Sequence, residues 1–182
     1  MKLEKGKLLV ADPSVLNDSS FNRAIILLTE HTKNSSVGFI LNKPLGYTIN
    51  DLMPEINSSF TIYQGGPVEQ DNLYFVHKIP ELIPESIKIA DGIYWGGNFN
   101  YLKKLLNNSI LQKSEIRFFL GYSGWTKEQL EEEIKEKFWF IAENNLSTLF
   151  MEKENNLWKK KLLEKGGSFT LWANAPENYN LN

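Results

Sequence analysis

The sequence RAIILLTEHTKNSSVGFIL, residues 23–41, indicates two strands joined by a turn. Its first run, Arg23 to Thr29, has a core from Ala24 to Leu28 that is apolar at every position, so both faces of that strand should be covered. The second run, Val37 to Leu41, follows the polar turn Asn34-Ser35-Ser36. We therefore expect a hairpin whose first strand lies in the interior of a sheet.

Further strand-like runs lie on both sides of this hairpin, bounded by turn-forming residues. They are Lys7 to Ala11, Phe60 to Tyr63, Leu73 to Val76, Ile87 to Ala90, Ile93 to Trp95 and Ile116 to Leu120. Asp91-Gly92 has the strongest short hairpin signal and should join the runs on either side of it.

Two helices are predicted in the central part of the chain. Apolar residues recur at helical spacing between Phe99 and Leu106, with Asn98 able to cap the start and Asn107-Asn108 suited to the exit. Thr126-Lys127-Glu128-Gln129 matches a capping box, and it precedes a helix that should bury Leu130, Ile134 and Phe138 on one face.

The C-terminal part is predicted to form a strand, a helix and a second strand. Phe138 to Ile141 is rich in β-favouring residues and should form a strand. A last helix is expected from Asn156 to Lys165, ended by Gly166-Gly167, and Ser168 to Trp172 is then expected to return as a final strand. Strands and helices do not alternate regularly, which favours an α+β fold with a curved mixed or antiparallel sheet.

Length and composition place the chain among ordinary globular proteins. It has 182 residues, 42% hydrophobic and 23% charged, and no linker-like segment divides it, so we expect a single domain over residues 1–182. The net charge of −2 argues against a partner held by bulk electrostatics, such as DNA. The sequence has no cysteine, no signal-peptide pattern and no apolar run of membrane-spanning length, which together favour a cytoplasmic location away from membranes.

The common catalytic motifs do not occur in the sequence. Neither G-x-x-x-x-G-K-[ST] nor G-x-G-x-x-G is present. Gly121-Tyr122-Ser123-Gly124 resembles a nucleophile elbow, but its second glycine comes one residue too early, and His31 and His77 precede the serine, against the α/β-hydrolase order. No spacing brings the histidines together as metal ligands, so we predict no catalytic residue, no metal site and no cofactor.

Charged runs are interpreted as ordinary surface. Glu128 and Glu131 to Glu133 fit a solvated helix face near the positive end of the helix dipole. Lys159-Lys160-Lys161 could contact phosphate, but a run this short on a terminal helix is usually solvent-exposed surface.

Two glycine-rich segments are the strongest site candidates from the residues themselves. Gln64 to Val68 follows a strand, and its paired glycines permit close approach of a ligand or of another backbone. Gly121 to Trp125 is predicted to be a turn that leads into the capped helix, where free N–H groups could bind an anion and Tyr122 and Trp125 could stack on a ligand. Tight structural turns with core aromatics are the alternative for both.

A family resemblance appears when the short motifs are taken in order. The chain has Gly6 to Ala11, Phe21-Asn22-Arg23, Thr29-Glu30-His31, Gly38 to Pro44, Gly65 to Val68, His77 and Gly121 to Trp125 followed by Gln129-Leu130-Glu131. In this order they strongly resemble the AlgH/YqgE family of bacterial proteins, from about Gly6 to Gly166. The family's GYAGW motif has Ser123 at its alanine position here.

The resemblance implies a compact, partly barrel-like α+β fold, a cytosolic protein and no established biochemical activity. The name AlgH refers to a proposed role in regulating alginate production. The resemblance therefore implies a non-catalytic regulatory or binding protein, a transcriptional regulator that acts through a protein or small-molecule partner and does not itself bind DNA. An enzyme with an unrecognised site, using His31 or His77 as a base, is the alternative. The candidate binding or motif residues are Arg23, His31, Asn42, Gly65, Gly66, Pro67, His77, Gly121, Tyr122, Gly124, Trp125 and Gln129.

Overall fold

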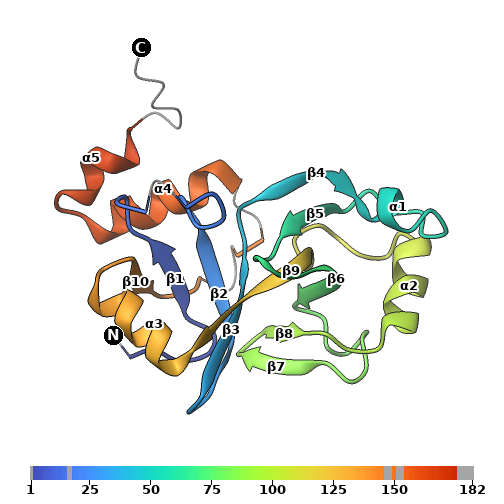
Figure 1. Ribbon diagram of the computed structural model, residues 1–182. Helices are drawn as coiled ribbons and strands as arrows, with labels where there is room; N and C mark the ends of the chain where they lie inside the picture. The colour runs from blue at the N-terminus through green and yellow to red at the C-terminus, as the bar shows by residue number, and fades with distance from the viewer. Residues whose placement is uncertain (1, 16–17, 146–148, 151–153, 176–182) are drawn as a thin grey trace.

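Long strands that pass between two groups of helices define the architecture (Figure 1). The computed structural model describes residues 2–15, 18–145, 149–150 and 154–175. The elements in these ranges are β1 (Leu8–Ala11), β2 (Ile25–His31), β3 (Ser35–Ile40), β4 (Pro44–Thr48), α1 (Ile49–Leu52), β5 (Thr61–Gln64), β6 (Val68–His77), β7 (Ile87–Ala90), β8 (Ile93–Trp95), α2 (Phe99–Asn107), β9 (Ile116–Thr126), α3 (Lys127–Lys135), β10 (Trp139–Ala142), α4 (Glu154–Lys165) and α5 (Phe169–Ala173).

The strands of the described residues form one ten-stranded sheet in the order β10-β1-β2-β3-β9-β6-β8-β7, with β5 paired to β9 and β4 to β5. The strand pairs along the main order are antiparallel, whereas β5 runs parallel to β9. The order begins at β10 and ends at β7, so the sheet is curved but does not close into a barrel. The α+β fold class expected from the sequence is therefore confirmed.

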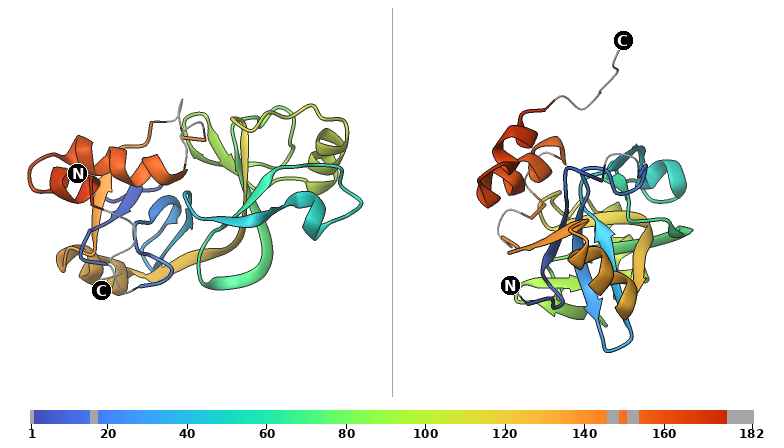
Figure 2. Two further views of the ribbon diagram at one scale, coloured as in Figure 1. Left: turned by 90° about the horizontal axis from the view of Figure 1, so that it is seen from above. Right: turned by 60° about the vertical axis from the view of Figure 1, so that its left-hand side comes forward.

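The two halves of the sheet carry different helices. Figure 1 shows α3, α4 and α5 beside β1, β2 and β10 on one side of β3, and α1 and α2 beside β5, β6 and β8 on the other. Figure 2 shows the same two groups at opposite ends when the molecule is seen from above. Strands β3 and β9 pair with each other and connect the two halves.

The predicted hairpin of residues 23–41 is confirmed. Strands β2 and β3 pair antiparallel, with Ile26 opposite Ile40 and Leu27 opposite Phe39. The first five residues of β2 are buried, because β1 and β3 flank the strand and side chains cover both of its faces. The hairpin of β7 and β8 around Gly92 is also confirmed.

Alternation along the strands divides the core into three clusters. Leu8 and Val10 of β1 pack in a cluster that includes Trp158 of α4, while Leu9 and Ala11 point to the other face, in the cluster that includes Leu130 of α3. The third cluster joins α2 to strands β5, β6 and β9. Its members include Ile62, Phe75, Leu102, Leu106 and Phe118.

The structure corrects the prediction of a turn at Gly121 to Trp125. This segment is the second half of β9, which pairs with β6 through Tyr122 and with β3 from Ser123 to Thr126. Gly121 supplies a bend at φ 69°, and the strand then continues. The two neighbouring ladders engage the backbone of this segment, so it is not the free anion-binding turn that the glycine spacing suggested.

Three smaller expectations are also corrected. Residues 168–172 do not form a strand, because Phe169–Ala173 is the short helix α5, closed by local bonds such as Phe169 N–H to Gly166 O. Phe138 lies beyond the end of α3 and is exposed. The sequence interpretation missed strand β4 and helix α1.

Within the described ranges, no helix is both long and apolar enough to cross a membrane.

Candidate functional site

The two glycine-rich segments lie against each other as a crossing of backbones. A Cβ atom on Gly65 would lie 2.1 Å from the carbonyl oxygen of Gly121, and one on Gly66 would lie 2.2 Å from the carbonyl carbon of Tyr122. The Gly65 carbonyl accepts bonds from Ile40 N–H and from the buried Ser123 hydroxyl. The crossing itself therefore leaves no room for a ligand, while Pro67 beside it is exposed.

Arg23 and Asn42 hold the entry to β2. Arg23 adopts a left-handed conformation at φ 55°, and the Asn42 amide donates to its carbonyl at 2.9 Å while accepting from Ile25 N–H at 2.9 Å. The Arg23 guanidinium lies over the Trp158 ring at 5.1 Å and donates to the Ala175 carbonyl. Asn42 thus joins the segment after β3 to the start of β2, and the Arg23 side chain joins that start to α4 and to the residues after α5.

His77 is fully buried on β6. Ile79 N–H donates to its Nδ1, so the proton of the neutral ring lies on Nε2, which faces the Gly96 carbonyl at 3.1 Å and the Ser86 hydroxyl at 3.0 Å. Ser86 donates its own proton to the Ile83 carbonyl. Burial lowers the pKa of His77 below its ordinary value of 6.5, so the ring is neutral and fully hydrogen-bonded.

His31 lies far from His77 along the sheet. Its Nδ1 contacts the Ser36 hydroxyl at 2.8 Å near the tip of the β2–β3 hairpin. Ser36 pairs with Trp125 and His77 pairs with Ile116, so nine residues of β9 separate the two positions, about 30 Å of extended strand. The structure does not bring the two histidines together.

Trp125 and Gln129 belong to a hydrogen-bonded cluster around Glu133 of α3. The indoles of Trp125 and Trp139 both donate to Glu133 Oε2, at 2.8 and 2.7 Å, and Gln129 Nε2 donates to Oε1 at 2.9 Å. Phe21 stacks against Trp125. Gly124 pairs with Val37 in the neighbouring ladder.

Tyr122 lines a cleft of about 240 Å³ on one face of the sheet. Five strands that are adjacent in the sheet, β2, β3, β9, β6 and β8, contribute to it. The lining residues are Thr29, Glu30, Val37, Phe39, Glu69, Tyr74, Trp95 and Tyr122. Tyr74, Trp95 and Tyr122 are only half-buried and extend the apolar cluster that α4 covers at its other end.

The walls of the cleft have a defined geometry. The rings of Tyr74 and Tyr122 meet edge to face, with centroids 5.9 Å apart and planes at 87°. The buried Phe39 ring lies 5.5 Å from Tyr74 and forms the floor. A register shift between Leu28 and Glu30 of β2 allows both Thr29 and Glu30 to face the cleft.

Sequence reasoning found Tyr122 but missed the other walls of this cleft. Tyr74 and Trp95 lie in runs that were interpreted only as strands, and Glu69 lies outside any predicted element. Their common face follows from β6 pairing with both β8 and β9. Aromatic residues on the predicted strands are the sequence signal for this cleft. The sequence does not show which strands pair, and that pairing is what brings these residues together.

Two other hollows fit a ligand less well. One of about 330 Å³ has mainly polar walls, from Asn57, Ser58, Ser59, Ser109 and Lys113, beside the apolar Phe60, Leu106 and Leu111. Most ligand pockets are predominantly apolar.

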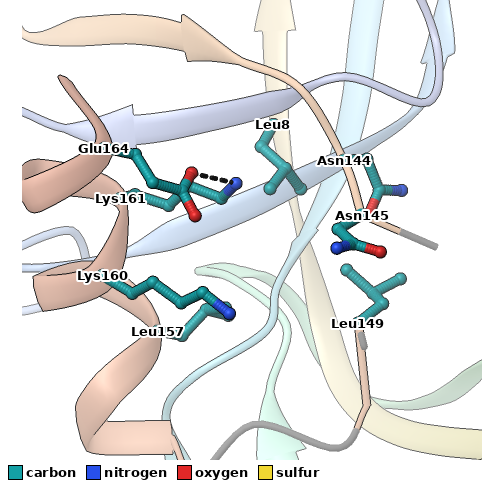
Figure 3. Close-up of a pocket in the computed structure, with 8 residues that line it drawn as sticks. All are labelled: Leu8, Asn144, Asn145, Leu149, Leu157, Lys160, Lys161 and Glu164. Atoms are coloured by element: carbon teal, nitrogen blue, oxygen red, sulfur yellow. Dashed lines mark hydrogen bonds and ion pairs between the residues drawn. The ribbon is translucent and has the colours of Figure 1, made fainter. Parts of the chain in front are cut away.

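The second hollow, shown in Figure 3, lies between α4 and the segment after β10. The Lys161–Glu164 ion pair borders it, and the Asn144 amide has no hydrogen-bond partner among the described residues. Its volume of about 20 Å³ is enough for a single water molecule.

The described residues contain no group of three or more His, Cys, Asp or Glu side chains suited to a metal ion. Within the described part of the chain, neither histidine is bonded to both a carboxylate and a nucleophile in the arrangement that acyl transfer uses. Of the three hollows described above, the aromatic cleft is the one that combines room for a ligand with mainly apolar walls.

A family model and individual relatives both place the chain in the same family. Residues 8–170 match the family described as AlgH-like (DUF179). A UPF0301 protein of Chlorobium phaeobacteroides is 39% identical over 100% of this chain and 97% of its own length, and one of Cytophaga hutchinsonii is 38% identical over 99% and 100%.

Two solved structures share the fold. The crystal structure of a Corynebacterium diphtheriae protein superposes with a TM-score of 0.77 at 21% identity, covering 96% of this chain and 94% of that one. The solution structure of AlgH from Pseudomonas aeruginosa gives 0.72 at 20% identity, covering 97% and 98%. With a family match over most of the sequence and relatives of this identity, the chain belongs to the AlgH-like family.

Proposed function

We propose that this chain is a cytosolic, non-catalytic regulatory protein that acts by binding a protein or small-molecule partner in the cleft across β2, β3, β9, β6 and β8. The observation that carries the proposal is the set of half-exposed aromatic side chains, Tyr74, Trp95 and Tyr122, grouped around one hollow. A concave site with apolar walls and a few polar groups is the usual form of a ligand pocket. Any effect on transcription would then pass through that partner.

The separation of the histidines supports a non-catalytic role. His77 is neutral, buried and fully hydrogen-bonded, and His31 lies at the far end of β9. A general base must reach the proton that it removes from a substrate. Neither histidine lines the cleft, so neither can act as a general base on a ligand bound there, which favours binding over catalysis.

The test is a thermal-shift screen of the full chain against metabolites and short peptides, because a ligand that binds only the folded state raises the unfolding temperature. Hits are then compared in Val37→Trp, which fills the cleft from β3. Tyr101→Ala removes an exposed aromatic residue on α2, outside the cleft, and serves as the control.

We expect hits to lose their shift in Val37→Trp and to keep it in Tyr101→Ala. Should Val37→Trp prove unstable, Tyr122→Ala removes one wall of the cleft instead. Hits that persist in folded forms of both cleft variants would show that the partner binds elsewhere and would overturn the proposal.

A further inference from the structure

The charged side chains that line the cleft are all negative. Of its eight lining residues, the charged ones are Glu30 and Glu69, and both are exposed. They stand on β2 and β6, and β3 and β9 lie between these strands. The cleft therefore has a carboxylate on each of two strands, with aromatic side chains lining the surface as well.

Glu69 is held in place by local bonds. Its backbone is left-handed at φ 48°, and its Oε2 accepts from the Tyr74 hydroxyl at 2.5 Å and from Asn72 Nδ2 at 2.8 Å. These two donors lower the pKa of Glu69, so the carboxylate stays ionised at neutral pH. The bond from Tyr74 also fixes the charge next to the ring of that tyrosine.

The aromatic walls offer the complementary surface. The faces of Tyr and Trp rings carry negative partial charge and attract cations. In the edge-to-face pair of Tyr74 and Tyr122, the edge of one ring covers part of the face of the other, and the surface of both rings that stays uncovered lines the cleft together with Trp95. Perpendicular aromatic walls of this kind hold alkylated ammonium groups in other proteins.

We infer that the cleft binds an organic cation, an ammonium or guanidinium group, which lies among Tyr74, Trp95 and Tyr122 and is paired with Glu30 and Glu69. This inference rests on the proposed function, because it names the ligand class of the same cleft. The volume of 240 Å³ lies below the range of about 300–1,000 Å³ for drug-sized ligands, so the cleft suits a small headgroup or one side chain. Nucleotides and other anions are disfavoured by the two carboxylates.

The experiment titrates the full chain with choline and with 3,3-dimethylbutan-1-ol, its uncharged carbon isostere, while amide and indole resonances are followed by NMR. The two probes have the same shape and differ in charge. Agmatine provides a free guanidinium, and peptides containing arginine or trimethyllysine distinguish a side-chain ligand from a free small molecule. Acetate tests the opposite charge.

We expect at least one cation to shift the resonances of Trp95 and Tyr122 and to bind at least tenfold more tightly than the uncharged isostere. Glu69→Gln should weaken that cation severalfold while leaving the isostere unchanged. The amide oxygen of the introduced side chain can still accept both bonds, so the variant removes charge with little change in shape. Glu128→Gln, on the exposed face of α3, is the matched control.

The outcomes separate the two claims. If every cation bound no more tightly than the uncharged isostere, or if acetate were preferred, with shifts confined to the cleft, the cation inference would be overturned and the proposed function would stay in place. Cations that bind wild type and Glu69→Gln equally would also overturn it. Failure of every probe to move cleft resonances removes the cation inference, and if no hit of the broader screen depends on Val37 either, the proposed function fails as well.

Discussion

The buried imidazole of His77 links stability to pH. Its pKa is lowered in the folded protein, so the unfolded chain binds a proton at a higher pH than the folded chain does. The contribution of this residue to stability is complete above the unfolded value of 6.5 and is lost as the pH falls through the folded value.

We therefore predict that wild type loses unfolding free energy between about pH 7.5 and about pH 5.5, and that His77→Gln loses less over this interval. Urea denaturation at several pH values measures both slopes. The carboxylates with lowered pKa, such as Glu69, titrate below 4.5 and do not contribute here. Parallel slopes in the two proteins would refute the prediction.

A substitution at Gly66 measures how much the close backbone crossing of Gly65-Gly66 with Gly121-Tyr122 limits the side chain at this position. The sequence suggested close approach of another backbone there, and the structure confirms it, with the Tyr122 carbonyl carbon 2.2 Å from the position of a Cβ. Gly66→Ala must separate two chain segments that are also hydrogen-bonded through Gly65, so we expect a loss of about 2–3 kcal/mol of unfolding free energy.

The matched control for that substitution is Gly124→Ala. A Cβ on Gly124 would approach only the side chain of Tyr122, at 3.2 Å, which has room to adjust. Chemical denaturation of both variants gives the comparison. Equal losses would show that backbone contact at Gly66 is not the cause.

Among the elements, α3 begins as the sequence predicted. Thr126 Oγ1 accepts the Gln129 N–H at 3.2 Å, but the Gln129 side chain bonds Glu133 in place of returning to Thr126, so only half of the capping box forms. Thr126→Ala should cost about 1 kcal/mol in a denaturant titration, whereas Thr126→Ser should cost far less. An unchanged midpoint in Thr126→Ala would contradict the cap.

Glu133 attaches α3 to β9 and β10. Both indoles that donate to it, from Trp125 and Trp139, are almost fully buried, so Glu133→Ala leaves two donors without their acceptor and should cost about 2–3 kcal/mol. Glu132→Ala, one residue earlier and exposed, should cost little. Tryptophan fluorescence during unfolding reports both variants, and similar midpoints would argue against this role of Glu133.

Elements with strong local signals were predictable, and those decided by distant partners were not. Asn98, Thr126 and Asp91-Gly92 fix their helices and hairpin locally, and the structure has each of these boundaries. Gly121 and Gly124 suggested a turn, but β3 and β6 on either side extend the strand through them.

After Gly167, the sequence suggested a strand and the structure has a helix. Apolar and β-favouring side chains suggested a strand, but local bonds from Phe169 and Thr170 close a short helix instead. A strand requires a neighbour to pair with, whereas a helical turn needs only its own residues.

At the scale of the molecule, the cleft depends on the strand order. Glu30, Glu69 and Trp95 come from three separate segments and meet only because β9 lies between β3 and β6 and β8 lies beyond β6. The periodicity of the sequence marks each strand but not its neighbours, so composition and motifs could indicate the fold class and could not assemble this site.

The distribution of charge over the molecule leads to the last prediction, which is that this chain alone does not bind duplex DNA. The net charge is −2, the cleft is acidic and α3 exposes Glu128, Glu131 and Glu132. The one basic run is weaker than its sequence implies, because Lys161 is buried and paired with Glu164 at 2.7 Å. Lys159 is the exposed lysine of this run and Lys160 is half-buried, so the run could neutralise few phosphates and would contribute only weak electrostatic affinity for DNA.

Fluorescence anisotropy with a labelled duplex at about 0.15 M salt measures this directly. We expect no saturable binding up to about 10 µM protein, and no change in Lys159→Ala or Lys160→Ala, because non-specific binding of DNA depends on a basic surface and this chain has a net charge of −2. An established DNA-binding protein on the same duplex verifies the probe. Sub-micromolar binding that weakens with salt and with the loss of Lys159 would show that the protein contacts DNA itself, and a partner would then not be needed for it to act on the genome.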